Sequence, residues 1–311
     1  MSLTRTPGNE PPEGLVTGHF LTSDGLRLRF GVSRVAHARG TVVVLQGRGD
    51  FFERYLETFR DLNAMGYAAA SFDFRGQGAS PRLQADPLRS NVPDFKLYDE
   101  DLASFMKHQV LPDCTAPFYL IGHSMGGCVA LRALQKHNWF SRAVLTSPML
   151  DVNTGRWPKP MARFIATFLT LLGFGDYLAP GRPGRPLGPD DFYGNDLTGD
   201  KLRYDRDQRV LQASPGLGIG GATLGWLRGA FAAMRTLSRL PEGTMLLAPT
   251  LIVAAGRERV TVTEACRDFA RRVVNVSFVI IGESRHEILM EKDAVRAQFW
   301  AAFESFVSPP R

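Results

Sequence analysis

The residues best suited to do chemistry stand in one short stretch, Gly122-His123-Ser124-Met125-Gly126. The apolar run before it, 118–121, predicts a buried strand, and the stretch after it, 125–137, predicts a helix. A nucleophilic serine sits on such a tight strand-to-helix turn, where glycine on either side avoids collisions. The helix also directs free N–H groups toward the space above the serine. The pattern therefore predicts Ser124 as a nucleophile, the alternative being an ordinary strand–loop–helix joint.

A serine nucleophile needs a base, and in this kind of sheet the partners follow in the order serine, acid, histidine. Two histidines come after Ser124. His137 falls near the end of the predicted helix and is expected at the surface. His286 lies in the loop 282–287, between the last predicted strand and the last predicted helix. Because parallel sheets place function at the carboxyl ends of their strands, we predict His286 as the base. A polar loop histidine is the alternative.

The acid should follow the preceding strand, and Glu258 is the only carboxylate in the loop 256–260. We therefore predict that Glu258 orients the imidazole. An exposed glutamate paired with a neighbouring arginine is the alternative, because such surface pairs are common. Asp268, inside the next predicted helix, is a weaker rival. Asp73 precedes the serine, does not fit the order, and is predicted to be a structural residue beside Arg75.

An oxyanion forms when a serine attacks an ester, and two backbone N–H groups are needed to stabilise it. One should be the N–H of Met125, directly after the nucleophile. The other should come from the glycine-rich loop after the predicted strand 42–45, and Arg48 or Gly47 would supply it.

Short apolar runs and amphipathic stretches alternate along the chain, which is typical of β-α-β units and a parallel sheet. An opening hairpin is predicted over 20–30, where Asp24-Gly25 supplies the turn. The other expected strands are 42–45, 68–74, 118–121, 143–146, 250–255 and 274–281. The expected helices are 52–65, 98–110, 125–137, 264–272 and 292–307.

The alternation stops between Met149 and about Pro241, where Pro, Gly and Arg become frequent and helical stretches follow one another. We predict a core formed by 1–148 and 242–311, with 149–241 inserted as a helical cap. The predicted fold class is α/β, with a mostly parallel, doubly wound sheet.

The composition is that of an ordinary globular protein, with 311 residues, 44% hydrophobic and 22% charged. Its three cysteines, Cys114, Cys128 and Cys266, have no metal-binding or disulfide spacing and suit a reducing compartment. The formal charge of +6 includes no Lys/Arg block, so no nucleic-acid partner is expected. No phosphate loop or dinucleotide motif is present, and we expect no metal and no cofactor.

Apolar stretches are too short to predict a membrane span, which needs about 18–20 residues. The nearest run is 164–174, and the polar stretch 1–14 contains no visible secretory signal. We expect a cytoplasmic protein, either free or peripherally bound to the inner face of the membrane.

Several motifs together resemble the α/β-hydrolase superfamily, and within it the branch of monoacylglycerol lipases and bacterial lysophospholipases, also called serine aminopeptidase-like. These are Leu-Gln-Gly-Arg-Gly-Asp at 45–50, Asp-Phe-Arg-Gly-Gln-Gly-Ala-Ser at 73–80, the serine motif, and Arg-His-Glu-Ile-Leu at 285–289. The resemblance implies the α/β-hydrolase fold and a serine hydrolase that cleaves carboxylic esters of single-chain lipids through an acyl-enzyme. Two positions depart from the branch: Gln46 stands where it often has His, and Glu258 where it usually has Asp.

We also predict that the cap supplies an apolar acyl tunnel. The candidates for its lining, or for contact with a membrane surface, are Phe164, Phe168 and Leu172; a buried core within the cap is the alternative. Three other functions stay open. An acyltransferase would use the same acyl-enzyme, an amino-terminal peptidase would hold a substrate amine with cap aspartates such as Asp190 and Asp191, and a ligand receptor would use the fold without catalysis.

Overall fold

The computed structural model of the chain describes residues 3–181 and 183–308. The two first positions of the polar N-terminal stretch, Arg182 of the cap and positions 309–311 lie outside the described residues. The described residues form one eight-stranded sheet with the strand order β1-β2-β4-β3-β5-β6-β7-β8. The strands are β1 (Leu15–Leu21), β2 (Arg27–Ser33), β3 (Thr41–Leu45), β4 (Ala68–Phe72), β5 (Phe118–His123), β6 (Arg142–Thr146), β7 (Thr250–Ala255) and β8 (Val276–Ile281).

The sheet is mostly parallel, as predicted. Strands β1 and β2 form the expected antiparallel hairpin, and β2 pairs antiparallel with β4. The pairs from β4 through β3 and β5 to β8 are all parallel. The carboxyl ends of β3, β5, β7 and β8 therefore lie at the same edge, and the loops that carry the predicted site residues follow them.

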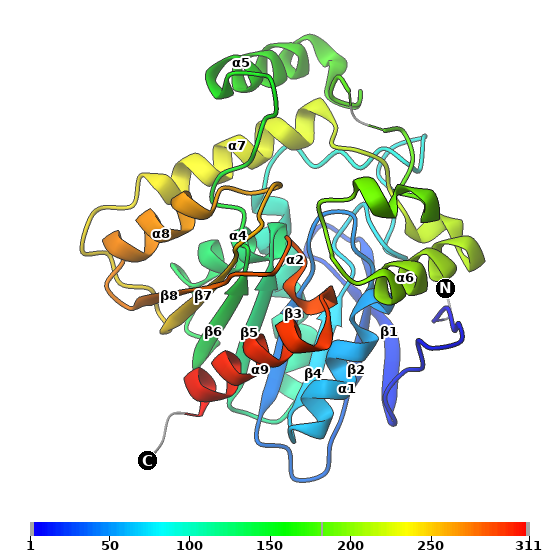
Figure 1. The fold of residues 1–311 in the computed structure, drawn as a ribbon, viewed down its shortest axis with the longest axis vertical. Helices are drawn as coiled ribbons and strands as arrows, with labels where there is room; N and C mark the ends of the chain where they lie inside the picture. Colours follow the sequence, from blue (N-terminus) through cyan, green and yellow to red (C-terminus); the bar gives the residue numbers. More distant parts are fainter. Residues whose placement is uncertain (1–2, 182, 309–311) are drawn as a thin grey trace.

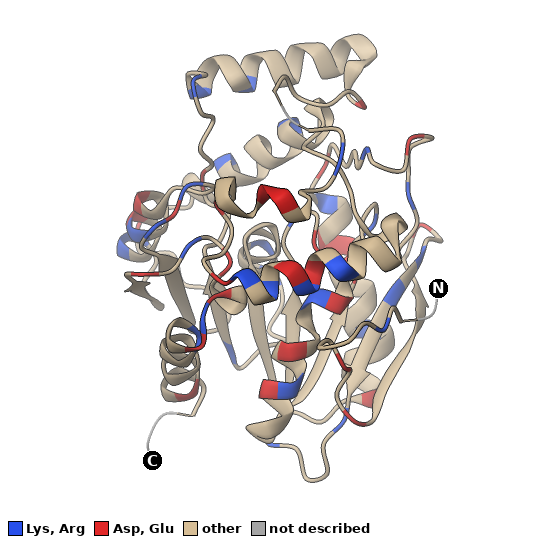
Figure 2. Cartoon of the chain, turned by 45° about the vertical axis from the view of Figure 1, so that its right-hand side comes forward, with Lys and Arg blue, Asp and Glu red and all other residues tan. Residues whose placement is uncertain are grey.

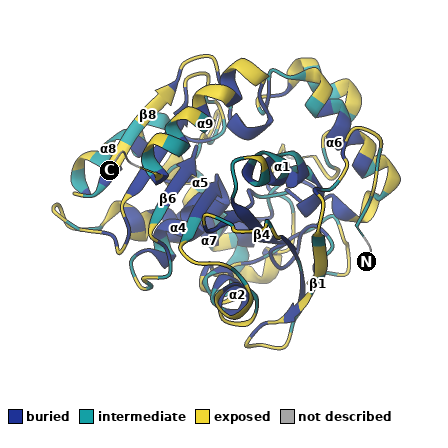
Figure 3. Ribbon diagram, turned by 90° about the horizontal axis from the view of Figure 1, so that it is seen from below, coloured by how far each residue is buried: buried dark blue, intermediate teal, exposed yellow. Residues whose placement is uncertain are grey.

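Helices cover both faces of the sheet (Figures 1 and 3). On one face, α1 (Leu56–Ala64) and α9 (Asp293–Val307) pack on alternate strand residues such as Val42 and Val44. On the other, α2 (Lys96–Phe105), α4 (Met125–Ala133) and α8 (Thr263–Arg272) pack on the intervening ones, such as Val43 and Leu45. Because neighbouring strand residues point to opposite faces, a strand covered on both sides needs a continuous apolar run.

Short helical segments extend this framework. The helix predicted over 52–65 consists of a 3₁₀ turn followed by α1, and the one predicted over 98–110 consists of α2 followed by a wider turn. The short segments of the core are η1 (Phe52–Tyr55), η2 (Met106–Val110), α3 (Leu111–Asp113) and η6 (Ile288–Met290).

The segment between β6 and β7, two strands that pair with each other, is helical. Its elements are α5 (Lys159–Leu169), η3 (Thr170–Phe174), η4 (Pro189–Gly194), α6 (Lys201–Ala213), η5 (Pro215–Leu217) and α7 (Leu224–Ser238). In Figure 1 these elements lie at one end of the sheet, with α5 outermost above α7, and α6 beside the core. Within the described part of the chain, no helix combines the length and apolar character needed to cross a bilayer.

Candidate active site

Ser124 stands on the turn between β5 and α4, with φ 48° and ψ −112°. Few residues other than glycine adopt a positive φ, so the backbone is strained at the residue that carries the hydroxyl. Sterics explain directly why position 126 is glycine. A Cβ placed there would lie 2.4 Å from the carbonyl oxygen of Leu45 and 2.6 Å from that of Gln46. The close passage of β3 therefore requires glycine at this point of the turn.

The three predicted residues meet at this edge of the sheet. His286 Nε2 lies 3.0 Å from Ser124 Oγ, and His286 Nδ1 lies 2.8 Å from Glu258 Oε2. The other carboxylate oxygen, Oε1, accepts hydrogen bonds from the N–H groups of Val260 at 2.8 Å and Thr261 at 3.1 Å. With its proton on Nδ1, the imidazole donates to Glu258, and its Nε2 accepts from the serine hydroxyl. The longer arm of glutamate thus reaches the histidine in this chain.

The environment of Glu258 keeps its carboxyl ionised. Burial raises its pKa, but the hydrogen bond and charge of His286, together with the N–H groups of Val260 and Thr261, lower the pKa to about 2. Its side chain is only 3% exposed. A buried carboxylate beside Nδ1 stabilises the imidazolium that forms when the histidine takes a proton.

The other candidates for these roles lie elsewhere. Asp268, on α8, pairs with Arg271 at 3.5 Å and is 63% exposed. His137 stacks on Trp139, with ring centroids 3.9 Å apart. His123 lies beside His286, at 4.8 Å between ring centroids, and burial with the neighbouring His286 lowers its pKa to about 3. A neutral His123 is therefore expected at physiological pH.

The predicted donors of the oxyanion hole all line the same cavity as Ser124. The N–H of Met125 opens α4 and has no acceptor within the helix. The N–H of Gly47 donates to Asp50 Oδ2 at 2.8 Å, so this N–H is already engaged within its own loop. The guanidinium of Arg48 reaches the cap, where it donates to the carbonyl of Gly220 at 3.0 Å.

The structure also places Gln46, the other departure from the motif pattern, and Asp73. Gln46 is fully buried, and its amide donates to Asp73 Oδ1 at 3.2 Å rather than facing the cavity. Asp73, predicted to be a structural residue, is fully buried. Asp73 pairs with Arg29 at 2.6 Å, whereas Arg75 pairs with Asp101 at 2.6 Å.

A cavity of about 790 Å³ opens onto Ser124 and His286. Its apolar wall comes largely from the cap and includes Ala162, Ile165, Ala166, Trp226, Leu227 and Phe231. The residues predicted to line an acyl tunnel, Phe164, Phe168 and Leu172, lie on the outer side of the same segment and are 66%, 49% and 56% exposed. This expectation is corrected: the inner side of α5 lines the cavity, whereas Phe164, Phe168 and Leu172 face outward.

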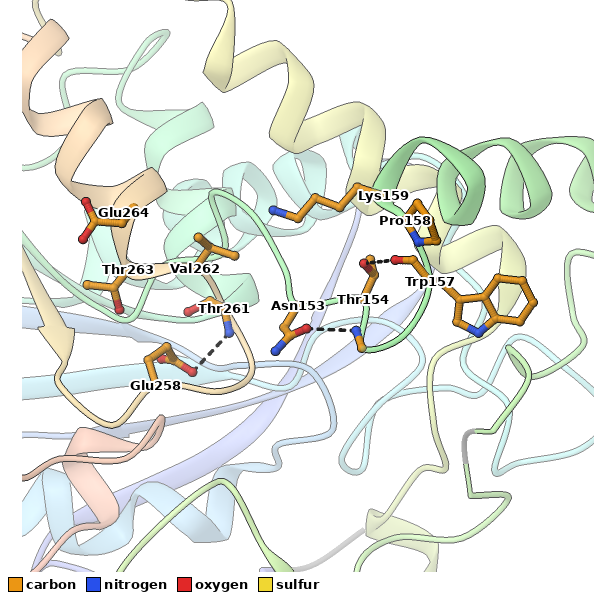
Figure 4. Close-up of a pocket in the computed structure, with 11 residues that line it drawn as sticks. Asn153, Thr154, Trp157, Pro158, Lys159, Glu258, Thr261, Val262, Thr263 and Glu264 are labelled. Carbon is orange, nitrogen blue, oxygen red and sulfur yellow. Dashed lines mark hydrogen bonds between the residues drawn. The ribbon is translucent and has the colours of Figure 1, made fainter.

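A second, open cavity of about 540 Å³ is lined in part by Glu258. Figure 4 shows Glu258 beside the start of α8, facing the cap residues Asn153 to Lys159 across this opening. Asn153, Thr154 and Trp157 line both cavities, so this stretch of the cap separates them.

Sequence reasoning missed a buried charge network that includes Glu287, the residue after His286. Arg54 donates to Asp207 Oδ2 at 2.8 Å and also pairs with Asp50 and Glu287. Asp50 follows β3, Glu287 follows the histidine, and Asp207 comes from α6. Only the docking of the cap brings the fourth member in, and the sequence contained no signal for that contact. Among the described residues, no group of His, Cys, Asp and Glu is placed to hold a metal ion.

Comparisons with known proteins identify the family and the fold. The sequence model of the family described as serine aminopeptidase, S33, matches residues 36–293. The chain is 32% identical over 292 residues to lysophospholipase L2 of Escherichia coli K12, covering 89% of this chain and 83% of the relative. It is 30% identical to monoglyceride lipase of Rattus norvegicus, over 48% of each chain. A structure of a soluble variant of monoglyceride lipase from Saccharomyces cerevisiae, bound to a substrate analogue, superposes with a TM-score of 0.72 at 18% identity, covering 94% of this chain and 96% of that one. At this identity the structural likeness bears on the fold alone.

Proposed function

The chain belongs to the serine aminopeptidase S33 family, has the α/β-hydrolase fold and is an ester hydrolase, and from this premise we propose that it cleaves carboxylic esters of single-chain lipids. The candidate substrates are lysophospholipids and monoacylglycerols. The names of the relatives support this substrate class, and the apolar wall beside Ser124 suits an acyl chain. The observation that carries the proposal is the chain of hydrogen bonds from Ser124 through His286 to Glu258, which opens onto that wall.

In the proposed reaction, Ser124 Oγ attacks the ester carbonyl carbon while His286 Nε2 takes the hydroxyl proton. Glu258 holds the imidazole through Nδ1 and stays ionised. The N–H groups of Met125 and Arg48 stabilise the oxyanion. His286 then returns its proton to the departing alcohol, which leaves an acyl-enzyme. Water attacks the acyl-enzyme by the same route and releases the fatty acid.

We also propose a peripheral membrane contact through α5 and η3. Residues 159–174 contain Lys159 and Arg163 but no acidic residue, and their outward side chains are apolar. Figure 2 shows α5 at the top of the molecule with basic but no acidic segments, whereas both signs of charge gather along α6. An apolar helix face flanked by cations suits an anionic lipid surface.

The first test is labelling with a fluorophosphonate probe, followed by hydrolysis of p-nitrophenyl esters, monoacylglycerols and lysophospholipids. Ser124→Ala should lose both labelling and turnover, because the attacking oxygen is gone. Turnover by Ser124→Ala equal to that of the wild type would contradict the proposal. Product analysis with an added glycerolipid acceptor separates hydrolysis from acyl transfer.

A further inference from the structure

The loop after β4 contains a buried amide that holds the loop after β3. Gln77 is fully buried and lies outside the described lining of the cavity. Its side-chain Nε2 donates to the carbonyl oxygen of Gly47 at 2.9 Å, and its Oε1 accepts from the N–H of Gly49 at 3.2 Å. Both ends of one amide are therefore bound to the backbone on either side of Arg48, the predicted second donor of the oxyanion hole.

These two contacts set the orientation of two consecutive peptide units. The carbonyl of Gly47 and the N–H of Arg48 belong to one planar trans peptide, so they point in opposite directions. A Gly47 carbonyl fixed on Gln77 thus also fixes the direction of the Arg48 N–H. In the same way, the N–H of Gly49 shares a peptide plane with the carbonyl of Arg48. The backbone of Arg48 cannot turn about φ or ψ without loss of one of the two hydrogen bonds.

The loop after β3 also runs against the turn that carries the nucleophile, because the carbonyl groups at its start lie against Gly126. Arg48 and Met125 both line the cavity beside Ser124. Gln77 lies on the other, buried side of the loop. An N–H of Arg48 that points away from Gln77 therefore points to the cavity side.

Gln77 itself stands in a tight turn. Its own N–H and carbonyl both form backbone hydrogen bonds within that turn, at 3.2 Å and 3.1 Å. The glycines on either side, Gly76 and Gly78, have φ values of 80° and 55°. A Cβ at Gly78 would lie 2.2 Å from Cγ of Asp73, so this turn accepts no larger residue there. The amide therefore projects from a backbone with little freedom to move, as a positioning group requires.

Asp50 holds the same loop by another contact. Its Oδ2 accepts from the N–H of Gly47 at 2.8 Å and from the hydroxyl of Tyr55 at 2.7 Å. Asp50 also lines the cavity and pairs with Arg54, so its substitution would change the charge of the cavity and the loop together. Gln77 carries no charge and is separated from the cavity by the loop, which makes it the better residue to test.

We propose that Gln77 is the positioning residue of the oxyanion hole. It aims the N–H of Arg48 at the oxygen that gains negative charge when Ser124 attacks the ester. Gln77 touches no part of the substrate and acts through the Gly47–Arg48 peptide. A donor that is aligned in advance contributes most in the transition state, where the charge on the oxygen is largest. This inference rests on the proposed function, in which the reaction passes through such an oxyanion.

A purely structural role is the alternative, because a buried amide that joins two loops also stabilises the fold. The two roles differ in their kinetics. An oxyanion donor that is turned away lowers kcat and leaves KM nearly unchanged, since the uncharged ester carbonyl depends on it less. A looser fold lowers Tm without this separation of kcat from KM.

The first variant is Gln77→Glu, which keeps the size and the acceptor for Gly49 but replaces the donor to Gly47 with an oxygen. Two acceptors would then face each other, and the Gly47–Arg48 peptide should rotate. For p-nitrophenyl butyrate we expect kcat to fall about 10²-fold while KM changes less than about threefold.

Gln77→Met is the second variant, because it removes both hydrogen bonds without adding charge. It should show the same fall in kcat at nearly constant KM. A thermal melt followed by circular dichroism checks that each variant is folded at the assay temperature. The methionine variant carries the test if the buried charge of the glutamate prevents folding.

A trifluoromethyl ketone inhibitor gives a readout that a structural role would not move. Ser124 adds to its carbonyl carbon, and the adduct carries a full oxyanion, whereas the bound ester in its ground state carries none. The inhibition constant of the Gln77 variants should therefore rise by about the same factor as their kcat/KM falls.

Asn275→Asp is the matched control. Asn275 Nδ2 donates to the carbonyl oxygen of Leu246 at 2.9 Å, and its Oδ1 accepts from the N–H of Leu246 at 2.9 Å. This amide also holds a backbone carbonyl and a backbone N–H, but it directly precedes β8 and so lies at the opposite edge of the sheet from Ser124. The substitution removes the same kind of donor and should leave kcat and the inhibition constant unchanged.

The outcomes separate this inference from the proposed function. The positioning role would be overturned by wild-type kcat in both Gln77 variants, by a fall in kcat without a matching rise in the inhibition constant, or by an equal fall in Asn275→Asp. Each of these results leaves the proposed function intact. Absence of probe labelling and of ester turnover in the wild type would instead overturn the proposed function.

Discussion

At the scale of the residue, the turn around Ser124 shows how closely the backbone limits the choice of side chain. Ser124 has a positive φ, and Gly126 lies against the carbonyl groups at the end of β3. These constraints explain why the tight turn, and Ser124 as its candidate nucleophile, could be predicted from sequence. Chain order and loop position then led to His286 and Glu258. The use of the Gly47 N–H by Asp50 could not be predicted, because it depends on the fold of one loop.

Gly126→Ala should destabilise the protein by roughly 2 kcal/mol or more, because the added methyl group meets backbone rather than a flexible side chain. Urea unfolding measures the difference. Gly216→Ala is the control: no described atom lies within 4 Å of a Cβ at that position, so its effect should stay within about 0.5 kcal/mol. Equal stability of the two variants would contradict the steric explanation.

Glu258→Gln should lower kcat for a p-nitrophenyl ester by about 10²- to 10⁴-fold with Tm almost unchanged. The amide keeps the size but loses the charge that stabilises the imidazolium. The Val260 and Thr261 N–H groups can still find an oxygen acceptor. Full activity of Glu258→Gln would show that this carboxylate does not serve as the acid.

At the scale of the element, the cap is attached to the core unevenly. Helix α6 is tied down by ion pairs: Arg203 and Arg206 both reach Glu57 on α1, at 2.6 Å and 2.5 Å. Helix α5 packs over α7 and exposes its other side. The sequence predicted a helical cap over 149–241 but not this difference, because the partners in each ion pair are far apart in the chain.

The ion pairs of Glu57 should make stability depend on pH. Burial raises the pKa of Glu57, but Arg203, Arg206 and Arg296 lower it to about 2, from 4.5 ordinarily. A carboxyl whose folded-state pKa is depressed stabilises the fold fully above pH 4.5, and the contribution is lost as pH falls through about 2. The stability advantage of the wild type over Glu57→Gln, up to roughly 3 kcal/mol, should therefore shrink below pH 4.5.

Urea unfolding from pH 7 down to pH 3 measures this advantage. Glu304→Gln provides the control. Glu304 forms an ion pair with Arg39, and their side chains are 34% and 44% exposed, respectively. Such an exposed pair contributes little. An advantage of the wild type over Glu57→Gln that stays constant down to pH 3 would contradict the role of these ion pairs.

The exposed side of α5 and η3 leads to a prediction about membranes. Leu171→Glu should weaken binding to vesicles of phosphatidylglycerol and phosphatidylcholine about tenfold, because it places a negative charge in the apolar surface. Leu202→Glu is the control: Leu202 is 80% exposed, against 70% for Leu171, but lies on α6. Equal weakening by both substitutions, measured by vesicle co-sedimentation, would contradict the proposed contact.

At the scale of the whole molecule, the order of strands and helices could be read from the alternation along the chain. Strand β3 is buried on both faces, and its unbroken apolar run indicated this. The two sides of the cavity could not be read in the same way. Phe164 and Phe168 looked like tunnel residues because they are large and apolar, but helix orientation turns smaller neighbours such as Ala166 inward. The carboxylates of Asp50 and Asp207 line the same cavity only because α6 packs against the loop after β3.

Hydrolysis at Ser124 would convert a neutral ester into a fatty-acid anion in a cavity whose described lining carries six carboxylates and three guanidinium groups, a formal charge of −3. Like charges repel most strongly where little water screens them, so the carboxylate of the product would be expelled from the cavity rather than retained. Product inhibition should therefore be weak. Oleic acid should inhibit ester turnover far less than oleylamine, which has the same chain length and the opposite charge, and comparison of their inhibition constants measures the difference. The charge of the cavity would thus help to set the rate at which the enzyme is freed for its next substrate.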